Sequence, residues 1–207
     1  MQTQRTTALV AREISLPTPT RVGRHPLESC LELRRSVRVF YKETMAIDDV
    51  GQLLWAAQGI TGAEGNRAAP SAGATYPLHV FLAAGRVDGL PPGVYRYISD
   101  SHEIRAVSSD DIREALAASA RQEWMSDAAV IVCIAANFQR TESKYGARGH
   151  NYVFMEAGAA AENLMLEAVA LGLGTTLVGA FDDDEVAKLY GLTTKERPIC
   201  MIPIGKH

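Results

Sequence analysis

Three arginines and a serine stand close together in Arg34-Arg35-Ser36-Val37-Arg38. A phosphate dianion is held best by several charge-assisted donors, and the guanidinium fork matches its oxygens. If this stretch is extended, alternation places Arg34, Ser36 and Arg38 on one side. The pattern therefore predicts an anion site. The alternative is that basic residues at a helix end complement the helix dipole and bind no ligand.

A second candidate is the segment Ala69–Pro77, which is built almost entirely from small residues. Small side chains let backbone amides approach a flat ligand, and the prolines stiffen the ends. The alternative is an ordinary connection between a helix and a strand.

A third candidate is the glycine-rich segment Gly172–Ala180. It is not the dinucleotide-binding fingerprint, because Leu177 stands where the third glycine should be and the segment leads into a strand instead of following one. We therefore expect no Rossmann site. Gly179 stands where a strand can present its backbone to a ligand.

The elements that must position these residues follow from hydrophobic periodicity and turn signals. Helices are expected at residues 27–35, 47–59, 110–120, 152–171 and 182–190, and strands at 78–84, 93–98, 103–106, 128–135, 175–178 and 199–204. Residues 1–26 carry three prolines and few apolar anchors, which predicts an extended arm before a single α+β domain at 27–207. The polar stretch 141–149 is expected to be a mobile loop.

Composition narrows the class of protein. The 207 residues are 47% hydrophobic, enough for a full core, and the net charge of −3 argues against a nucleic-acid partner. The sequence has neither an apolar run long enough to span a membrane nor the apolar core of a signal peptide. We therefore expect a cytoplasmic protein with a small-molecule substrate.

The sequence predicts no metal site. Cys30, Cys133 and Cys200 are far apart and are expected to be buried thiols. The five histidines show no ligand spacing. The acidic run Asp182–Asp184 is explained by the capping of a helix.

Several segments together resemble the nitroreductase superfamily of flavoproteins, and look closest to its SagB-type branch. The similarity runs from Ile14 to Lys206. Its motifs are Leu54-Trp55-Ala56-Ala57-Gln58-Gly59-Ile60-Thr61, Pro70-Ser71-Ala72-Gly73-Ala74-Thr75-Tyr76-Pro77, Gly93-Val94-Tyr95-Arg96-Tyr97, Lys144-Tyr145-Gly146-Ala147-Arg148-Gly149 and Gly179-Ala180-Phe181-Asp182-Asp183-Asp184. The chain departs from the branch at His150-Asn151, where many members carry Tyr-Arg.

The resemblance implies a fold and a quaternary structure. The family fold is a three-layer α+β sandwich, with a central, mostly antiparallel sheet flanked by helices and an intertwined homodimer built on long central helices. The run of small residues Ala157–Ala161 is consistent with close helix approach. The alternative is that this helix lies in the core of a monomer.

The resemblance also implies FMN as cofactor. The residues it would place at FMN are Arg34, Arg35, Ser36, Arg38, Gln122, Leu177, Val178, Gly179, Ala180 and Lys206, together with Pro70, Ser71, Ala72 and Gly73 of the partner subunit. Arg38 would lie on the pyrimidine side, where a cation stabilises negative charge. The backbone of Gly179 would lie near the hydride-accepting nitrogen.

Two enzymatic activities and one non-enzymatic role fit the resemblance. The first is ping-pong hydride transfer from NAD(P)H to a nitroaromatic or quinone-like acceptor. The second is SagB-type oxidation of an azoline, for which Lys144 and Tyr145 match a catalytic pair. A lysine acts as a base only where burial lowers its pKa, so the alternative for this pair is a solvated lysine and a packing aromatic. The third is a non-catalytic flavin-binding or accessory protein.

Overall fold

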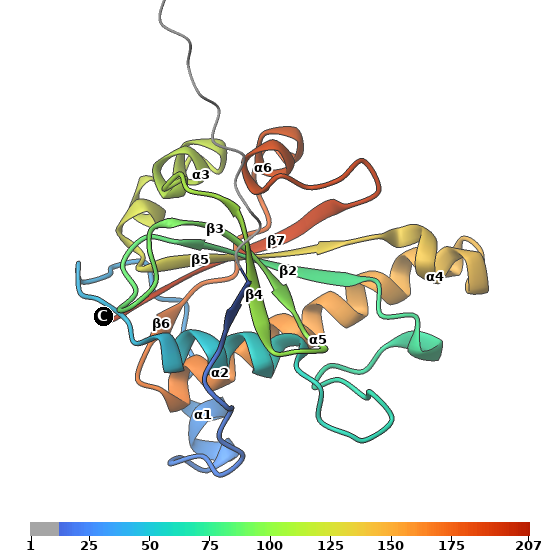
Figure 1. Ribbon diagram of the computed structural model, residues 1–207, viewed down its shortest axis with the longest axis horizontal. Coiled ribbons are helices and arrows are strands. Elements are labelled where there is room, and N and C mark those ends of the chain that lie inside the picture. Colours follow the sequence, from blue (N-terminus) through green and yellow to red (C-terminus); the bar gives the residue numbers. More distant parts are fainter. Residues whose placement is uncertain (1–12) are drawn as a thin grey trace, which may run out of the picture.

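A seven-stranded antiparallel sheet forms the centre of the molecule (Figure 1). The computed structural model describes residues 13–207, so residues 1–12 of the predicted arm lie outside the described residues. The strand order is β1-β4-β3-β2-β5-β7-β6. The strands are β1 Glu13–Ser15, β2 Leu78–Ala84, β3 Gly93–Ile98, β4 Glu103–Ser108, β5 Val130–Ala136, β6 Gly174–Thr175 and β7 Arg197–Gly205.

The central strands β2, β5 and β7 hold the sheet together. All seven residues of β5 are buried, as expected of a continuous run rich in Val and Ile. Leu82 of β2 pairs with Val132 of β5, which in turn pairs with Ile202 of β7. Pro203 lies inside β7, next to the point where the two-residue strand β6 has ended. A proline is tolerated there because no ladder hydrogen bond to β6 is lost.

Helices cover both faces of the sheet, which confirms the three-layer α+β arrangement (Figure 1). The helices are α1 Leu27–Leu33, α2 Ile47–Gln58, α3 Arg113–Ser119, α4 Phe138–Tyr145, α5 Arg148–Ala170 and α6 Asp183–Tyr190. Helices α2 and α5 pack on one face around Leu54, Leu164 and Val132. Helices α3 and α6 pack on the other face around Leu116, Val186 and Ile131. Helix α1 lies outside α5.

The polar stretch expected to be a loop is helical, and this prediction was wrong. Residues 138–145 form α4, and α5 begins at Arg148, before the predicted start. Helix α4 is anchored because Phe138 and Thr141 are buried, and the Thr141 hydroxyl lies 2.8 Å from that of Thr75. Two anchors on one face are too few to produce a clear apolar periodicity in the sequence.

Most other boundaries differ from the sequence prediction by one or two residues, and two differ by three. Helix α3 begins at Arg113, three residues later than expected, because the Arg113 guanidinium and backbone N–H both bond to the Asp111 carboxylate ahead of the helix. The predicted strand 175–178 is reduced to β6, followed by a separate bridge between Val178 and Met201.

Candidate functional site

The predicted anion-binding residues lie in an extended segment, residues 34–41, beside the end of the sheet. The Val37 N–H donates to the Thr175 carbonyl oxygen (2.9 Å), and the Thr176 hydroxyl donates to the Val37 carbonyl oxygen. Further along, the Tyr41 N–H donates to the Lys206 carbonyl oxygen (2.8 Å). We call residues 34–41, 174–180 and 205–207 the cation half-site.

The arginines and the lysine of this half-site form no ion pair with a buried carboxylate among residues 13–207. Arg34 Nε lies 3.6 Å from a carboxylate oxygen of Glu162, and both side chains are partly exposed. The Arg35 guanidinium donates to two backbone carbonyl oxygens, and Arg38 is exposed. Lys206 Nζ lies 3.0 Å from Glu43 in an exposed pair. Exposed pairs of this kind are weak, so the charges remain available to an anionic ligand.

The segment Leu177–Ala180 continues this half-site. Val178 is buried and exchanges two backbone hydrogen bonds with Met201, of 2.8 and 2.9 Å. Its neighbours turn outward: Leu177 is 48% exposed, and a Cβ added at Gly179 would meet no atom within 4 Å. The segment therefore presents backbone and an apolar side chain on an open surface.

Gln122 connects to the cation half-site through two aromatic rings. The Trp124 indole N–H donates to the Gln122 side-chain oxygen (2.6 Å). The Trp124 ring lies 6.2 Å from the ring of Phe40, which belongs to the extended segment. Gln122 is thus linked to the extended segment through Trp124 and Phe40, and its contact with a cofactor stays a prediction.

The predicted loop residues and the predicted catalytic pair lie together in the same chain. The Lys144 ammonium donates to the Gly73 carbonyl oxygen (3.1 Å). Gly73 has a φ of 57°, and a Cβ there would lie 2.4 Å from the Tyr145 hydroxyl oxygen. The absence of a side chain therefore permits this approach. We call Pro70–Gly73, Lys144 and Tyr145 the loop half-site.

The two half-sites lie toward opposite ends of α5 (Figure 1). Lys144 and Tyr145 immediately precede α5, whereas Arg34 pairs with Glu162 in its second half. A 23-residue helix is about 35 Å long. A single chain therefore does not bring the predicted catalytic pair to the predicted phosphate-binding arginines.

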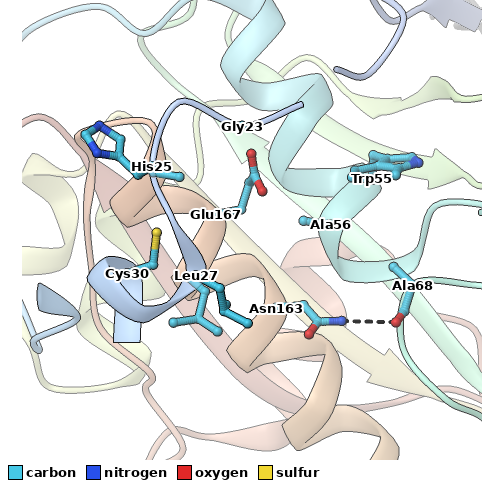
Figure 2. A pocket seen from close by; sticks show the side chains of 11 residues that line it. Gly23, His25, Leu27, Cys30, Trp55, Ala56, Ala68, Asn163 and Glu167 are labelled. Atoms are coloured by element: carbon cyan, nitrogen blue, oxygen red, sulfur yellow. Dashed lines mark hydrogen bonds between the residues drawn. The ribbon is translucent and has the colours of Figure 1, made fainter. Parts of the chain in front are cut away.

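A pocket of about 300 Å³ lies between α1, α2, α5 and the segment before α1 (Figure 2). Trp55, Cys30 and Glu167 line it, and Asn163 on its wall donates to the Ala68 carbonyl oxygen (3.2 Å). Burial raises the pKa of Glu167. None of the residues predicted to bind the cofactor or to be catalytic lines this pocket.

Sequence reasoning missed a buried glutamate beside the loop half-site. Glu156 of α5 is 4% exposed, and its Oε1 has no hydrogen-bond partner among residues 13–207. Burial raises its pKa to about 7, against the lowering effects of the Ser71 hydroxyl and of the Arg67 charge. The signal was present in the sequence, since Glu156 falls on the helix face that carries Val153 and Ala160.

A second buried glutamate, Glu196, was also missed. Its carboxylate contacts His79 Nδ1, lies 3.2 Å from the Arg96 guanidinium and accepts two hydrogen bonds from Thr193, of 2.8 and 2.9 Å. Burial raises the pKa of Glu196, but the hydrogen bonds from His79 and Thr193, with the charge of Arg96, outweigh it and bring the pKa to about 2. This group joins the start of β7 to β2 and β3, on the sheet face opposite α5.

The architecture defines the class of protein first. An open antiparallel sheet between two helical layers, with a cation-rich edge and a long central helix, is the nitroreductase fold. The chain belongs to the nitroreductase family, whose sequence profile matches residues 31–206. Family membership supports an oxidoreductase.

The relatives agree with this assignment. A protein of Methanocaldococcus jannaschii, provisionally named a nitroreductase, is 40% identical over 195 residues, which cover 94% of this chain and 96% of that protein. Microcin B17-processing protein McbC of Escherichia coli is 28% identical over 131 residues, 59% of this chain and 47% of that protein. A crystal structure of a provisionally named nitroreductase from Ralstonia eutropha superposes with a TM-score of 0.82 at 29% identity, covering 94% of this chain and 89% of that chain.

Within residues 13–207, no helix is long and apolar enough to cross a membrane. The same residues contain no group of three or more His, Cys, Asp or Glu side chains arranged to hold a metal ion. The three cysteines are free and buried, as predicted.

Proposed function

We propose that the protein is a cytoplasmic, FMN-dependent oxidoreductase that acts as a homodimer. It would use NAD(P)H to reduce an electron-poor small molecule such as a nitroaromatic or a quinone, by a ping-pong mechanism. Membership of the nitroreductase family and the two half-sites support this proposal.

The separation of the half-sites along α5 carries the proposal. Two copies of α5 packed antiparallel would bring the loop half-site of one chain to the cation half-site of the other. The outer face of α5 suits such packing, because Phe154 is 48% exposed, Met155 is 63% exposed and Gly158 has open space around it. Helix α1 adds exposed leucines at 27, 31 and 33. Apolar surface of this extent marks an interaction site.

The donor set fits FMN. The phosphate and ribityl chain would be held by Arg34, Arg35, Ser36 and Lys206. The three cations among them have no buried charge partner, and Ser36 would add a hydroxyl donor. Leu177, Val178, Gly179 and Ala180 offer an open apolar edge with accessible backbone for the flat ring. Gln122 and the partner's copy of the loop Pro70, Ser71, Ala72 and Gly73 would complete the surroundings. When bound, FMN supplies the chemistry of accepting a hydride and passing it on.

The chain's own residues orient the reaction. Arg38 would supply positive charge on the pyrimidine side of the ring, where negative charge accumulates. The exposed Leu177 would exclude water from the face used in turn by donor and acceptor. The Gly179 position leaves room for close approach.

One observation favours a second candidate function, SagB-type oxidation of an azoline-like substrate. Lys144 and Tyr145 converge on Gly73, so both polar groups stand at the loop proposed to face the flavin. McbC, named for processing microcin B17, shares 28% identity over part of the chain. In this reaction Lys144 would remove a proton from substrate carbon while the hydride leaves to the cofactor.

Absorbance spectroscopy separates these candidates. The purified chain should carry flavin bands that bleach on anaerobic addition of NADPH or NADH, because a reductase accepts hydride from either nicotinamide. Bands that persist with both donors but bleach with a thiazoline peptide would favour the azoline oxidase. Flavin that neither reagent bleaches would indicate a non-catalytic flavin-binding protein. No flavin, even after reconstitution with FMN, would overturn the proposal.

Arg34→Ala tests the phosphate assignment. A charge-assisted hydrogen bond contributes about 1.5–3 kcal/mol, so the FMN dissociation constant should rise about ten- to a hundredfold in a flavin-fluorescence titration. Arg105→Ala is the matched control, since Arg105 forms an exposed pair with Glu13 at the far edge of the sheet. Equal affinity in the two variants would remove Arg34 from the site. Gel filtration checks that both variants keep the oligomeric state of the parent chain.

A further inference from the structure

Glu156 is a buried acid without a charge partner beneath the loop half-site. It projects from α5, is 4% exposed and leaves Oε1 without a hydrogen-bond partner among the described residues. The Ser71 hydroxyl, at the beginning of the loop, is the side-chain hydrogen-bonding group that acts on it. A buried polar atom without a partner is uncommon and calls for an explanation.

The loop above Glu156 has an unusual backbone. Gly73, Ala74 and Tyr76 have φ values of 57°, 54° and 44°, a region that residues other than glycine seldom adopt. The Ser71 hydroxyl oxygen accepts the Tyr76 N–H at 2.9 Å, closing the loop. Such a conformation persists only where surrounding contacts hold it. The contact partner of Glu156 is therefore also the residue that closes the loop.

Two arginines face Glu156, one from the loop and one from α4. Arg67 and Arg140 both lower its pKa by their charge, yet neither forms an ion pair with it within residues 13–207. Arg67 is engaged elsewhere: its guanidinium donates to the Gln58 side-chain oxygen (3.0 Å) and lies 4.7 Å from the centre of the Tyr76 ring. Helix α2 contributes only the neutral Gln58 to this group.

We propose that Glu156, as a neutral carboxylic acid, positions the Ser71–Tyr76 loop and that its ionisation loosens this loop. The inference deepens the proposed function, because the loop is the part of one subunit that would face the flavin held by the other. Glu156 acts through Ser71 and touches neither substrate nor cofactor, so it is a positioning residue.

Glu156 depends on its protonation state in this way because few hydrogen-bond donors surround its carboxyl group. A neutral acid tolerates this site, whereas a buried carboxylate with one hydroxyl donor is costly. Once charged, Glu156 attracts Arg67, the cation whose charge acts on it most strongly, away from Gln58 and from the Tyr76 ring. Because Arg67 covers Tyr76, its movement removes a contact that holds the strained end of the loop.

Hydrogen exchange of the full chain tests the proposal without bound FMN. Amide protection factors of residues 71–76, corrected for intrinsic rates, should fall as the pH rises through about 7, the pKa of Glu156. One ionisation changes protection by at most about tenfold per pH unit. In Glu156→Gln, which stays neutral, protection should be independent of pH.

Glu167→Gln is the matched control. Glu167 also lies on α5 with a pKa raised by burial, but it faces Gln52 and not the loop. This variant should keep the pH dependence of the parent chain. A parent chain whose loop protection does not change with pH, or a Glu156→Gln variant that changes in the same way as the parent, would overturn the inference. Loss of the pH dependence in Glu167→Gln would overturn the assignment to Glu156.

A titration with FMN links the inference to the proposed function. Because the FMN phosphate loses its second proton at about pH 6, each dissociation constant is divided by that of Glu156→Gln at the same pH. This ratio should increase with pH through the same range for the parent chain and for Glu167→Gln. A ratio that does not vary with pH, alongside pH-dependent loop protection, would overturn the step from loop to cofactor. Absence of FMN binding at every pH would overturn the proposed function, while hydrogen exchange would still decide the role of Glu156 in the loop.

Discussion

Glu196 and Glu156 are two buried carboxyl groups that differ in their hydrogen-bond partners and in their pKa values. Both are almost fully buried, at 6% and 4% exposure. Glu196 has His79, Arg96 and Thr193 around it and a pKa of about 2. Glu156 has the Ser71 hydroxyl, two arginines that form no ion pair with it, and a pKa of about 7. Burial is the same, so the number of close donors decides the charge state.

The regions around the two residues differ in the same way. At the corner between α6 and β7, both carboxylate oxygens of Glu196 have close partners, and the corner lies against the apolar core of α3 and α6. The region at Glu156 contains two buried atoms without partners among residues 13–207, Glu156 Oε1 and Gln58 Nε2. Unsatisfied buried groups are costly and gather where function requires them. The contrast indicates that the first region stabilises the fold and the second is adapted to the loop half-site.

Removing the charge of Glu196 should have the largest effect on stability. Glu196→Gln leaves the Arg96 guanidinium without its counter-ion, so the free energy of unfolding at neutral pH should fall by about 3 kcal/mol in urea titrations. The carboxylate stabilises the fold fully above its ordinary pKa of 4.5, and this stability is lost as the pH falls through about 2. The difference between parent and variant should therefore shrink in acid.

The control for this prediction is Lys188→Met, which breaks the exposed pair of Lys188 with Glu185. It should cost less than about 0.5 kcal/mol. A loss in Glu196→Gln no larger than that of the control would show that the corner is not a stabilising centre.

Glu156→Gln should have a smaller effect of the opposite sign. The pKa of Glu156 is raised in the folded state, so its neutral form stabilises the fold fully below about 4.5, and that stability is lost as the pH rises through about 7. At pH 8 the variant should be more stable than the parent by about 1–2 kcal/mol, within the range seen when a buried charge is removed. At pH 4.5 the two should unfold alike. Destabilisation of the variant at both pH values would contradict the comparison.

Gly73→Ala should have the smallest effect, about 1 kcal/mol of stability, because its φ of 57° disfavours a side chain. Gly89, with a φ of 75° and open space around it, is the matched control. The added Cβ at residue 73 must also displace the ends of Lys144 and Tyr145. An equal loss in both variants would mean that this displacement costs nothing.

Secondary structure was predicted best where the hydrophobic pattern of a single segment was enough to identify the element. Strands β2 and β5 were predicted with nearly correct bounds because each is a continuous apolar run bounded by turns. Helix α4 was missed because its polar sequence is held by only two buried residues, one of them bonded to Thr75 far away in the chain. A helix that is held by distant tertiary contacts of this kind shows no hydrophobic periodicity in its own sequence.

Residue types drew attention to the arginine segment and to the small-residue loop, but on their own they left an ordinary helix end and an ordinary connection as alternatives. The assignment of both segments to FMN, with the loop contributed by the partner subunit, came from the family resemblance and stays a prediction. Their placement toward opposite ends of α5 depends on how the long helix crosses the sheet, which no local pattern specifies. The Glu196 group was not predicted for the same reason, since His79 lies in β2, Arg96 in β3 and Glu196 directly before β7.

The hydrogen bond between Thr176 and Val37 joins residues 139 positions apart, and this separation determines when the cation half-site can form. A ribosome adds about 5–20 residues per second, so on the order of ten seconds of synthesis separates its two sides. Strand β6 also pairs with β7, and these are the two strands of the sheet that are synthesised last. A cofactor at this site is therefore captured only after the other strands of the sheet have been made, and cannot serve as a template around which those strands fold during synthesis.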